Sequence, residues 1–169
     1  MVDIRILELG PGQFDLVRLL SAAGATVVSI DHDPAVVALG KKRGYNIIEA
    51  DFRQFEWASF AGKFDGLVSR GSITPRWFGT PGPYGELIDG ICSVLDPQGW
   101  GWITPFHTTL SQNPPAYAEM MLSAERQAFE RNGFHGFDLP PAVARRYAIG
   151  LYPILYLKGE LLHHFGDVD

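Results

Sequence analysis

The chain has 169 residues, of which 46% are hydrophobic and 20% are charged, and its formal net charge is −5 at pH 7. This length predicts one domain with a sizeable core, and the composition is ordinary for a soluble globular protein. The acidic balance argues against a nucleic-acid partner, because binding to phosphate relies on a basic surface.

Two further features of the whole chain bear on its location. No stretch approaches the roughly 18 apolar residues that a membrane-spanning helix needs, and the N-terminus lacks the pattern of a signal peptide. The single cysteine, Cys92, rules out an intrachain disulfide. We therefore expect a cytoplasmic protein in a reducing compartment, without a membrane partner.

The first expected element is a buried strand that runs into a glycine-rich bend. The strand covers Ile4–Leu9, and the bend is formed by Gly10, Pro11 and Gly12. A helix with apolar positions follows over residues 16–23. A strand, a glycine bend and a helix N-terminus together form a cofactor-binding corner in doubly wound folds.

The charges around the bend indicate what kind of cofactor this corner could hold. Asp15 stands where a dinucleotide fingerprint counted from Gly10 has its third glycine, and a carboxylate there would repel a pyrophosphate. Glu8 gives the strand an acidic end, which suits an ammonium or sulfonium group. We therefore expect a cofactor that carries positive charge and no phosphate.

The pattern Glu8-x-Gly10-x-Gly12 resembles motif I of class I S-adenosylmethionine-dependent methyltransferases. The resemblance implies that S-adenosylmethionine is the cofactor and that Glu8, Gly10, Pro11 and Gly12 bind it. In that family a third glycine commonly follows, whereas this chain has Phe14. We expect the phenyl ring to narrow the pocket near the methionine moiety.

The second strand is expected over residues 25–30 and ends in an acidic loop. Asp31 lies 21 residues after Gly10, where a carboxylate is placed to accept both ribose hydroxyls. Asp33 is better explained as a helix N-cap, with Pro34 in the first helical position. The family resemblance puts His32 against the adenine, and an exposed loop histidine is an equal alternative.

A helix over residues 35–42 and a short strand over residues 46–49 come next. The resemblance then assigns Asp51 to the exocyclic amine of adenine and Phe52 to its ring. The alternative is that Asp51 caps a helix and Phe52 belongs to the core.

The fourth strand is expected over Phe64–Ser69 and should end at the switch point of the sheet, where ligands bind. Ser69 and Arg70 would line that crevice. Residues 73–85 are rich in glycine and proline and are interpreted as a loop. Its Arg76 and Trp77 are candidates for a substrate-binding lid, or the loop aromatics simply pack on the domain.

The second half of the chain should complete the sheet. A helix is expected over residues 86–95, a turn over 96–99 and a strand over 100–106, in which the tryptophans belong to the core. His107 follows the end of that strand and is a weak candidate for a general base.

The C-terminal part should add one long helix and two strands. Asn113 is expected to cap the helix, which reaches Arg131, and the strands cover residues 134–139 and 148–158. Pro153 argues for an edge or a bulge in the last strand. The tail histidines, His163 and His164, have no partner at metal spacing, so no metal is assigned.

These features predict one α/β domain over residues 1–169, a Rossmann-like three-layer sandwich with a seven-stranded, mostly parallel sheet and an antiparallel C-terminal strand. The expected activity is methyl transfer from S-adenosylmethionine to an unidentified acceptor, with a small molecule favoured over a protein. The alternative is a non-catalytic binding or interaction module of the same fold, and a nicotinamide oxidoreductase is a third hypothesis. Because the first strand begins almost at Met1, we expect either an open site or one covered by a partner subunit or a loop.

Overall fold

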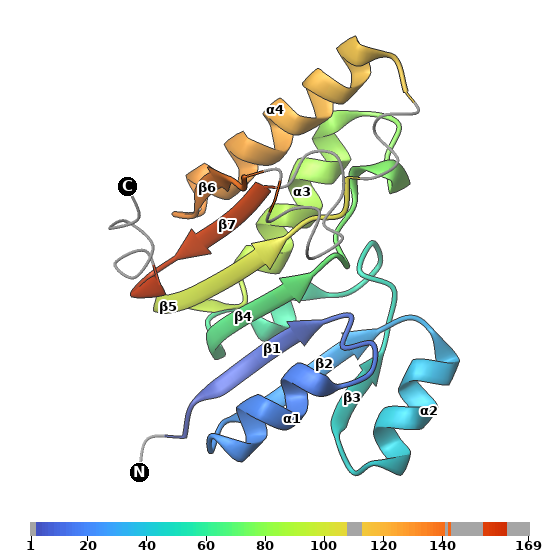
Figure 1. Cartoon of the computed structure of the whole chain (residues 1–169), viewed down its shortest axis with the longest axis vertical. Coiled ribbons are helices and arrows are strands. Elements are labelled where there is room, and N and C mark those ends of the chain that lie inside the picture. The colour runs from blue at the N-terminus through green and yellow to red at the C-terminus, as the bar shows by residue number, and fades with distance from the viewer. Residues whose placement is uncertain (1–2, 108–112, 141, 143–153, 162–169) are drawn as a thin grey trace.

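The computed structural model describes residues 3–107, 113–140, 142 and 154–161. Within these residues a seven-stranded sheet forms the centre of the molecule and helices lie against both of its faces (Figure 1). The strands are β1 (Arg5–Leu9), β2 (Thr26–Asp31), β3 (Asn46–Glu49), β4 (Phe64–Arg70), β5 (Leu95–Thr104), β6 (His135–Asp138) and β7 (Ile154–Lys158). The helices are α1 (Asp15–Ala22), α2 (Pro34–Lys42), α3 (Pro81–Cys92) and α4 (Pro115–Arg131).

The order of the strands creates a switch point in the middle of the sheet. The order is β3-β2-β1-β4-β5-β7-β6, and the pairs from β3 to β5 are parallel. The chain therefore winds outward from β1 through β2 to β3, and then returns to the other side of β1 with β4. Ligands of such sheets bind beyond the carboxyl ends of the two strands at this point, here β1 and β4.

The C-terminal strands close the sheet in the antiparallel sense. β7 pairs antiparallel with both β5 and β6, which confirms the predicted seven-stranded, mostly parallel sheet. β7 is thus an inner strand, and β6 forms the edge. Pro153, which argued for an edge or bulge, lies outside the described residues, as do His163 and His164.

The alternating side chains of the strands divide the core into two clusters. Leu7 and Leu9 of β1 join the larger cluster, to which α3 and α4 contribute, whereas Ile6 joins the smaller cluster under α1 and α2. Because successive residues of a strand point to opposite faces, Glu8 shares the face of Ile6 and lies on the α1 side.

Phe14 departs from its expected position. Its ring is fully buried in the smaller cluster and stacks on Tyr45 with a centroid distance of 5.2 Å. The ring therefore packs beneath α1 and α2, and the expectation that it narrows the methionine pocket is wrong. The backbone explains why: Phe14 has φ 65°, the left-handed conformation that the family's third glycine would adopt easily, and this turns the side chain into the core.

The helix α3 begins earlier than the sequence indicated. Residues 81–85 were expected to belong to a loop, but the helix starts at Pro81, with Pro83 also in its first turn. Proline is tolerated there because the first N–H groups of a helix have no intrahelical partner. The remaining loop, residues 73–80, contains a short 3₁₀ turn over Pro75–Trp77.

Two other local expectations change, and one is confirmed. The expected turn over residues 96–99 lies inside β5 as an irregularity, where the pairing with β4 shifts register between Phe64 and Gly66. The N-cap of α4 is Pro114 and not Asn113, because the helix begins at Pro115. Asp33 caps α2 as expected and accepts a hydrogen bond from the Ala35 N–H at 2.8 Å.

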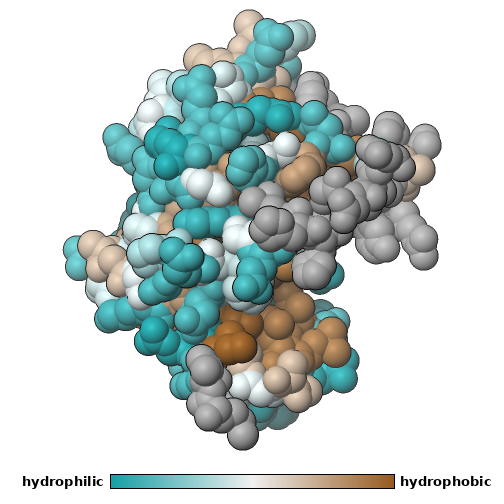
Figure 2. All heavy atoms as spheres, turned by 90° about the vertical axis from the view of Figure 1, so that its left-hand side faces the viewer, coloured by the Kyte–Doolittle hydropathy of each residue, from teal (hydrophilic) through white to brown (hydrophobic). Residues whose placement is uncertain are grey.

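One face of the molecule carries an apolar region among the described residues. Figure 2 shows hydrophobic atoms gathered toward the lower end of the face turned to the viewer, the end at which Figure 1 places α1 and the N-terminus. Leu19 of α1 is 59% exposed and Ile4, just before β1, is 44% exposed. Among the described helices, none combines the length and the apolar character required to cross a membrane.

The packing of Phe14 predicts the effect of filling a nearby glycine. A Cβ atom at Gly40 in α2 would lie 2.6 Å from the Phe14 ring and 3.0 Å from Ile47. We expect Gly40→Ala to destabilise the protein by about 1–3 kcal/mol in urea unfolding, although alanine is the better helix former. Gly82→Ala in α3 is the control, because no atom lies within 4 Å of its Cβ position. That variant should be neutral or stabilising by up to about 1 kcal/mol, and equal effects of the two changes would contradict the packing.

Candidate cofactor-binding site

Glu8 is a buried carboxylate at the switch point of the sheet. The residue is only 6% exposed, and its Oε2 atom has no hydrogen-bond partner. Burial raises the pKa of Glu8 from 4.5 to about 7, and the positive charge of Arg70 partly offsets this rise. An unpartnered carboxylate in such a place costs stability, and a cation that bound there would offset that cost.

Two serine hydroxyls are also buried without a hydrogen-bond partner. Ser29 Oγ on β2 and Ser69 Oγ on β4 are buried without a partner, and with Glu8 Oε2 they are the three such side-chain atoms among the described residues. Ser29 stands in register with Glu8, and Ser69 stands in register with Leu9. Glu8 and Ser29 therefore share the face toward α1, whereas Ser69 shares the opposite face with Leu9, and all three lie toward the carboxyl ends of their strands, where ligands of such sheets bind.

The bend after β1 uses its two glycines differently. Both have left-handed φ values, 67° at Gly10 and 53° at Gly12. A Cβ at Gly10 would lie 2.0 Å from Ser72 Oγ, so this glycine is required by the loop after β4. A Cβ at Gly12 would meet nothing within 4 Å, so the backbone there stays open to a ligand. Pro11 between them is buried.

Asp31 is the last residue of β2. It is 8% exposed, and its Oδ1 accepts a hydrogen bond from the Asp33 N–H at 2.9 Å. This bond fixes the carboxylate at the strand end and leaves Oδ2 to meet other donors. The side chain of His32 is 68% exposed, with its Nδ1 3.7 Å from Asp31 Oδ1, so it is a loop histidine that still borders the site.

Asp51, which the resemblance assigns to the adenine, binds a neighbouring arginine. Asp51 binds Arg53, whose Nε lies 3.0 Å from Oδ1 and whose backbone N–H donates to the same oxygen at 2.9 Å. These hydrogen bonds lower the pKa of Asp51 to about 2 despite some desolvation. The carboxylate is thus engaged within the protein and is not a free acceptor.

Phe52 belongs to an aromatic group beneath this region. Its ring lies 6.2 Å from the rings of both Trp57 and Trp77, and it is only 5% exposed. The Arg53 guanidinium lies 5.8 Å above the Trp77 ring. The alternative reading of Phe52 as a core residue therefore describes its packing, and Trp77 partly packs on the core instead of standing free as a lid.

Arg70 and Arg76 are the cationic candidates after β4. Both are exposed, and Arg70 is the last residue of β4, directly after the buried Ser69. Arg76 lies in the short 3₁₀ turn, where its N–H lies 3.4 Å from the Thr74 hydroxyl that caps the turn. Of the two, only Arg70 is brought to the switch point.

His107 lies in a buried polar cluster and not on an open surface. Its Nε2 is 2.9 Å and 3.0 Å from the two carboxylate oxygens of Glu125 on α4. Tyr84 of α3 donates to Glu125 Oε2, and Tyr156 of β7 donates to Oε1 at 3.0 Å. Burial first, and then the negative charge of Glu125, raise the pKa of both tyrosines.

The sequence analysis missed Glu125 and its two tyrosines. Glu125 occurs on α4 between Met121 and Phe129, which are both fully buried and lie one helical turn away on either side. A carboxylate in an apolar stripe was therefore the available signal. Its partners could not be found in this way because they lie 41 and 31 residues away in the chain.

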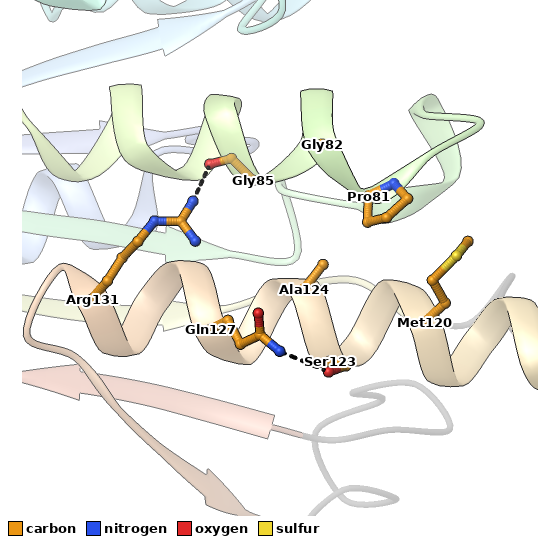
Figure 3. Close-up of a pocket in the computed structure, with 8 residues that line it drawn as sticks. All are labelled: Pro81, Gly82, Gly85, Met120, Ser123, Ala124, Gln127 and Arg131. Atoms are coloured by element: carbon orange, nitrogen blue, oxygen red, sulfur yellow. Dashed lines mark hydrogen bonds between the residues drawn. The ribbon is translucent and has the colours of Figure 1, made fainter.

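Two surface hollows lie apart from the switch point. One, of about 380 Å³, runs between α3 and α4, and its lining includes Met120, Gln127 and Arg131 (Figure 3). Its polar groups are satisfied internally, since Gln127 donates to Ser123 and Arg131 to the Gly85 carbonyl. The other, of about 540 Å³, lies on the outer side of the bend, around residues 13–18, 43 and 45. Within the described residues, no group of three metal-ligating side chains occurs.

Comparisons with known proteins identify the fold. A methyltransferase dependent on S-adenosylmethionine from Mesorhizobium loti superposes with a TM-score of 0.65 and 16% identity, covering 92% of this chain and 89% of that one. A 1,6-didemethyltoxoflavin-N1-methyltransferase from Burkholderia thailandensis was solved with bound 1,6-didemethyltoxoflavin and S-adenosylhomocysteine. It superposes with a TM-score of 0.60 and 17% identity, covering 94% of this chain and 72% of that one. A chain from the complex between the Haloferax volcanii Trm112 methyltransferase activator and a methyltransferase superposes with a TM-score of 0.61 and 16% identity. The match covers 92% of this chain and 83% of that one.

These likenesses show that the chain has the Rossmann-like fold of class I S-adenosylmethionine-dependent methyltransferases, as the sequence resemblance predicted. No protein-family model and no curated protein matches the sequence. The structural relatives act on varied substrates, so the fold by itself does not identify an acceptor.

The unpaired carboxylate of Glu8 predicts a pH-dependent gain in stability on its removal. The folded protein holds the Glu8 proton up to a pKa of about 7, whereas the unfolded chain releases it near 4.5. Stability is therefore lost as pH rises between these values, and the full cost is present above pH 7. We expect Glu8→Gln to stabilise the ligand-free protein by about 2–3 kcal/mol more at pH 8 than at pH 5.

Urea unfolding at the two pH values measures this difference. Asp65→Asn is a suitable control because Asp65 is a partly exposed carboxylate near the opposite end of the sheet, where it accepts the Arg5 N–H. A Glu8→Gln variant whose stability relative to the parent does not change with pH would contradict the buried, unpartnered carboxylate.

The polar cluster around Glu125 predicts a large stability loss from a small change. The Glu125 carboxylate contacts Tyr84, Tyr156 and His107. Glu125→Gln replaces one of its accepting oxygens with an amide group that donates hydrogen bonds. We expect destabilisation of about 2–4 kcal/mol, because buried donors lose their acceptor. Glu119→Gln on the exposed side of α4 should change the stability by less than about 0.5 kcal/mol. Equal stability of the two variants would show that the cluster does not form.

Proposed function

We propose that the protein binds S-adenosylmethionine at the switch point and transfers its methyl group to an acceptor. The observation that carries this proposal is the set of unpartnered polar atoms at the strand ends, led by the buried carboxylate of Glu8. A cationic ligand neutralises that carboxylate, whereas a diphosphate would face two acidic residues, Glu8 and Asp15. The fold supports the same cofactor.

The proposed cofactor contacts follow the strand order. Asp31 at the end of β2 accepts hydrogen bonds from the ribose hydroxyls through its free oxygen. The backbone of Gly12 admits the ligand closely, while Gly10 and Pro11 keep the bend in shape. Glu8 contacts the charged end of the ligand from the α1 face of β1, and Ser69 contacts the ligand from the other face at the end of β4. His32 lies beside the adenine. Asp51 contacts the adenine after the ligand has replaced the contact between Asp51 and Arg53.

When bound, S-adenosylmethionine supplies a methyl group on a sulfonium, which is already an activated donor. The contribution of this chain is placement, since holding the donor against an aligned acceptor and excluding water lowers the barrier most. The loop over residues 73–80, with Arg76 and Trp77, lies after β4 beside this corner and is proposed to contact the acceptor.

We favour a small molecule as the acceptor and S-adenosylhomocysteine as the product. The acidic net charge disfavours nucleic acid, and one structural relative carries a small heterocyclic substrate. Another relative is bound to the activator Trm112, so an activating protein partner is compatible with this fold without being required by it.

His107 is the proposed base where the acceptor has a proton to lose. Glu125 engages its Nε2 through both carboxylate oxygens. Glu125 is then a positioning residue that fixes the tautomer of His107. The ring is fully buried, so proton exchange with an acceptor requires local opening around it.

A non-catalytic binding module is the second candidate function. One observation favours it: the carboxylate of Asp51 is paired with Arg53. The proposed adenine contact is therefore occupied before a ligand binds. Such a module would bind S-adenosylmethionine without consuming it, and production of S-adenosylhomocysteine with a panel of small acceptors separates the two functions.

Isothermal titration with S-adenosylmethionine tests the cofactor assignment. We expect saturable binding by the parent protein, weakened in Asp31→Ala by about 1.5–3 kcal/mol, the range of a hydrogen bond to a charged group. Asp33→Asn is the matched control, since asparagine still caps α2 and the residue is exposed. Unchanged affinity in a folded Asp31→Ala variant would refute the ribose contact, and absence of binding by the parent would refute the function.

A further inference from the structure

Arg53 connects two loops whose strands are not neighbours in the sheet. Asp51 and Arg53 follow β3, whereas Trp77 lies in the loop after β4, and β2 and β1 stand between these two strands. The Arg53 guanidinium nevertheless lies 5.8 Å above the Trp77 ring while it is paired with the Asp51 carboxylate. The three side chains therefore join the loops on the two sides of the proposed cofactor site.

The backbone places Asp51 beside the proposed ribose contact. Glu49, the last residue of β3, is in register with Asp31, and the Ala50 N–H donates to the Asp31 carbonyl at 2.9 Å. Asp51 is the next residue. The charge of His32, which follows Asp31, contributes to the lowered pKa of Asp51, and this agrees with their proximity. The Asp51 carboxylate thus lies where the base of a nucleoside held by Asp31 would extend.

Arg53 contacts its neighbours in the way that an aminopurine base would. A guanidinium is flat and carries its N–H donors at its edge. Its edge faces Asp51, with Nε 3.0 Å from Oδ1 and 3.1 Å from Oδ2, and its face covers the Trp77 ring. An adenine that donates its exocyclic amine to Asp51 needs the same carboxylate. Arg53 and the base therefore compete for one acceptor.

The contacts also indicate which side chain moves when the base arrives. The side chains of Arg53 and Asp51 are 46% and 28% exposed, and exposed ion pairs contribute little stability. Trp77 is held more firmly, because its ring packs 6.2 Å from Phe52 and against the larger core cluster. Arg53 is thus the part that can be displaced, while Asp51 and Trp77 remain in place.

We propose that Arg53 is an autoinhibitory residue, which occupies the adenine contact on Asp51 in the ligand-free protein and leaves when the nucleoside binds. This inference rests on the proposed function, because it concerns the same ligand. It adds that the chain lowers its own affinity for the nucleoside through an internal competitor. It also adds that Arg53 weakens the selection for a base with an amine, because it occupies the group that would recognise the amine.

Calorimetric titration with S-adenosylhomocysteine tests the competition without any acceptor. Arg53→Ala leaves the backbone hydrogen bond to Asp51 Oδ1 and frees Oδ2. We expect this variant to bind about three- to tenfold more tightly than the parent protein, since it loses one exposed ion pair and one contact with an aromatic ring. Arg53→Lys keeps the charge without the flat face, so its affinity should fall between the two.

Three further measurements make the assignment specific. In an Asp51→Ala background, Arg53→Ala should change the affinity by less than about twofold, because Arg53 then has no carboxylate to occupy. Arg5→Gln removes an exposed arginine at the opposite end of β1 and should leave the affinity unchanged. In competition with S-adenosylhomocysteine, adenosine should gain over purine riboside, which lacks the amine, when Arg53 is replaced by alanine. Thermal unfolding checks that each variant is folded.

The outcomes separate this inference from the function on which it rests. If the parent protein binds S-adenosylhomocysteine and Arg53→Ala binds it no more tightly, autoinhibition is refuted while the cofactor assignment stands. An equal gain in Arg5→Gln, or a gain that persists without the Asp51 carboxylate, would refute the competition for Asp51 in the same way. If the parent protein does not bind S-adenosylhomocysteine, the proposed function fails together with this inference.

Discussion

The buried carboxylate of Glu8 is the feature on which the rest of the site depends. It lies under α1 at the carboxyl end of β1, with one oxygen unpartnered and a raised pKa. Nothing in the folding of the sheet requires an acid there, since an apolar residue beside Ile6 would join the same cluster. A group that lowers stability and serves no packing purpose is typical of a binding site, where the ligand provides the missing partner.

The shape of the bend after β1 is maintained by the protein core. Phe14 accepts a backbone conformation that is unfavourable for a side chain by about 1–2 kcal/mol. Burial of its ring against Tyr45 and beneath Gly40 offsets that cost, since burying a phenylalanine contributes about 1.5–3 kcal/mol. The chain thereby keeps the left-handed turn of the family motif without its third glycine. The conformation of the bend therefore depends on how Phe14 packs against α1 and α2.

The sequence predicted those parts of the structure that depend on local patterns. The strands from β1 to β4 are short apolar runs, and the cap formed by Asp33 and Pro34 depends only on neighbouring residues. The start of α3 was missed because Pro81 and Pro83 are helix breakers except in a first turn. The direction of the Phe14 ring depends on the sign of one φ angle, which composition and spacing do not reveal.

The long-range contacts of the site could not be obtained in the same way. The position of Asp51 after β3 predicted an adenine contact, and the sequence did not indicate that Arg53, two residues away, binds the Asp51 carboxylate. The pairing of Glu125 with Tyr84 and Tyr156 joins three elements that are distant in the chain. The sequence predicted the strands and the bend that carry the candidate residues, whereas the partners of the charged side chains had to be found from the structure.

The two ends of the proposed site differ in how much must change for a ligand to bind. At the charged end, Glu8 is already buried and one of its oxygens has no partner, so a ligand gains that interaction without breaking another. At the adenine end, a ligand must compete with the Asp51–Arg53 pair. That pair is partly exposed, and exposed ion pairs contribute only about 0–1 kcal/mol, so exchange costs little. Phe52 is different, because its ring is fixed between two tryptophans. Affinity and selectivity should therefore arise mainly from the ribose and the charged end, with the adenine held by weaker and exchangeable contacts.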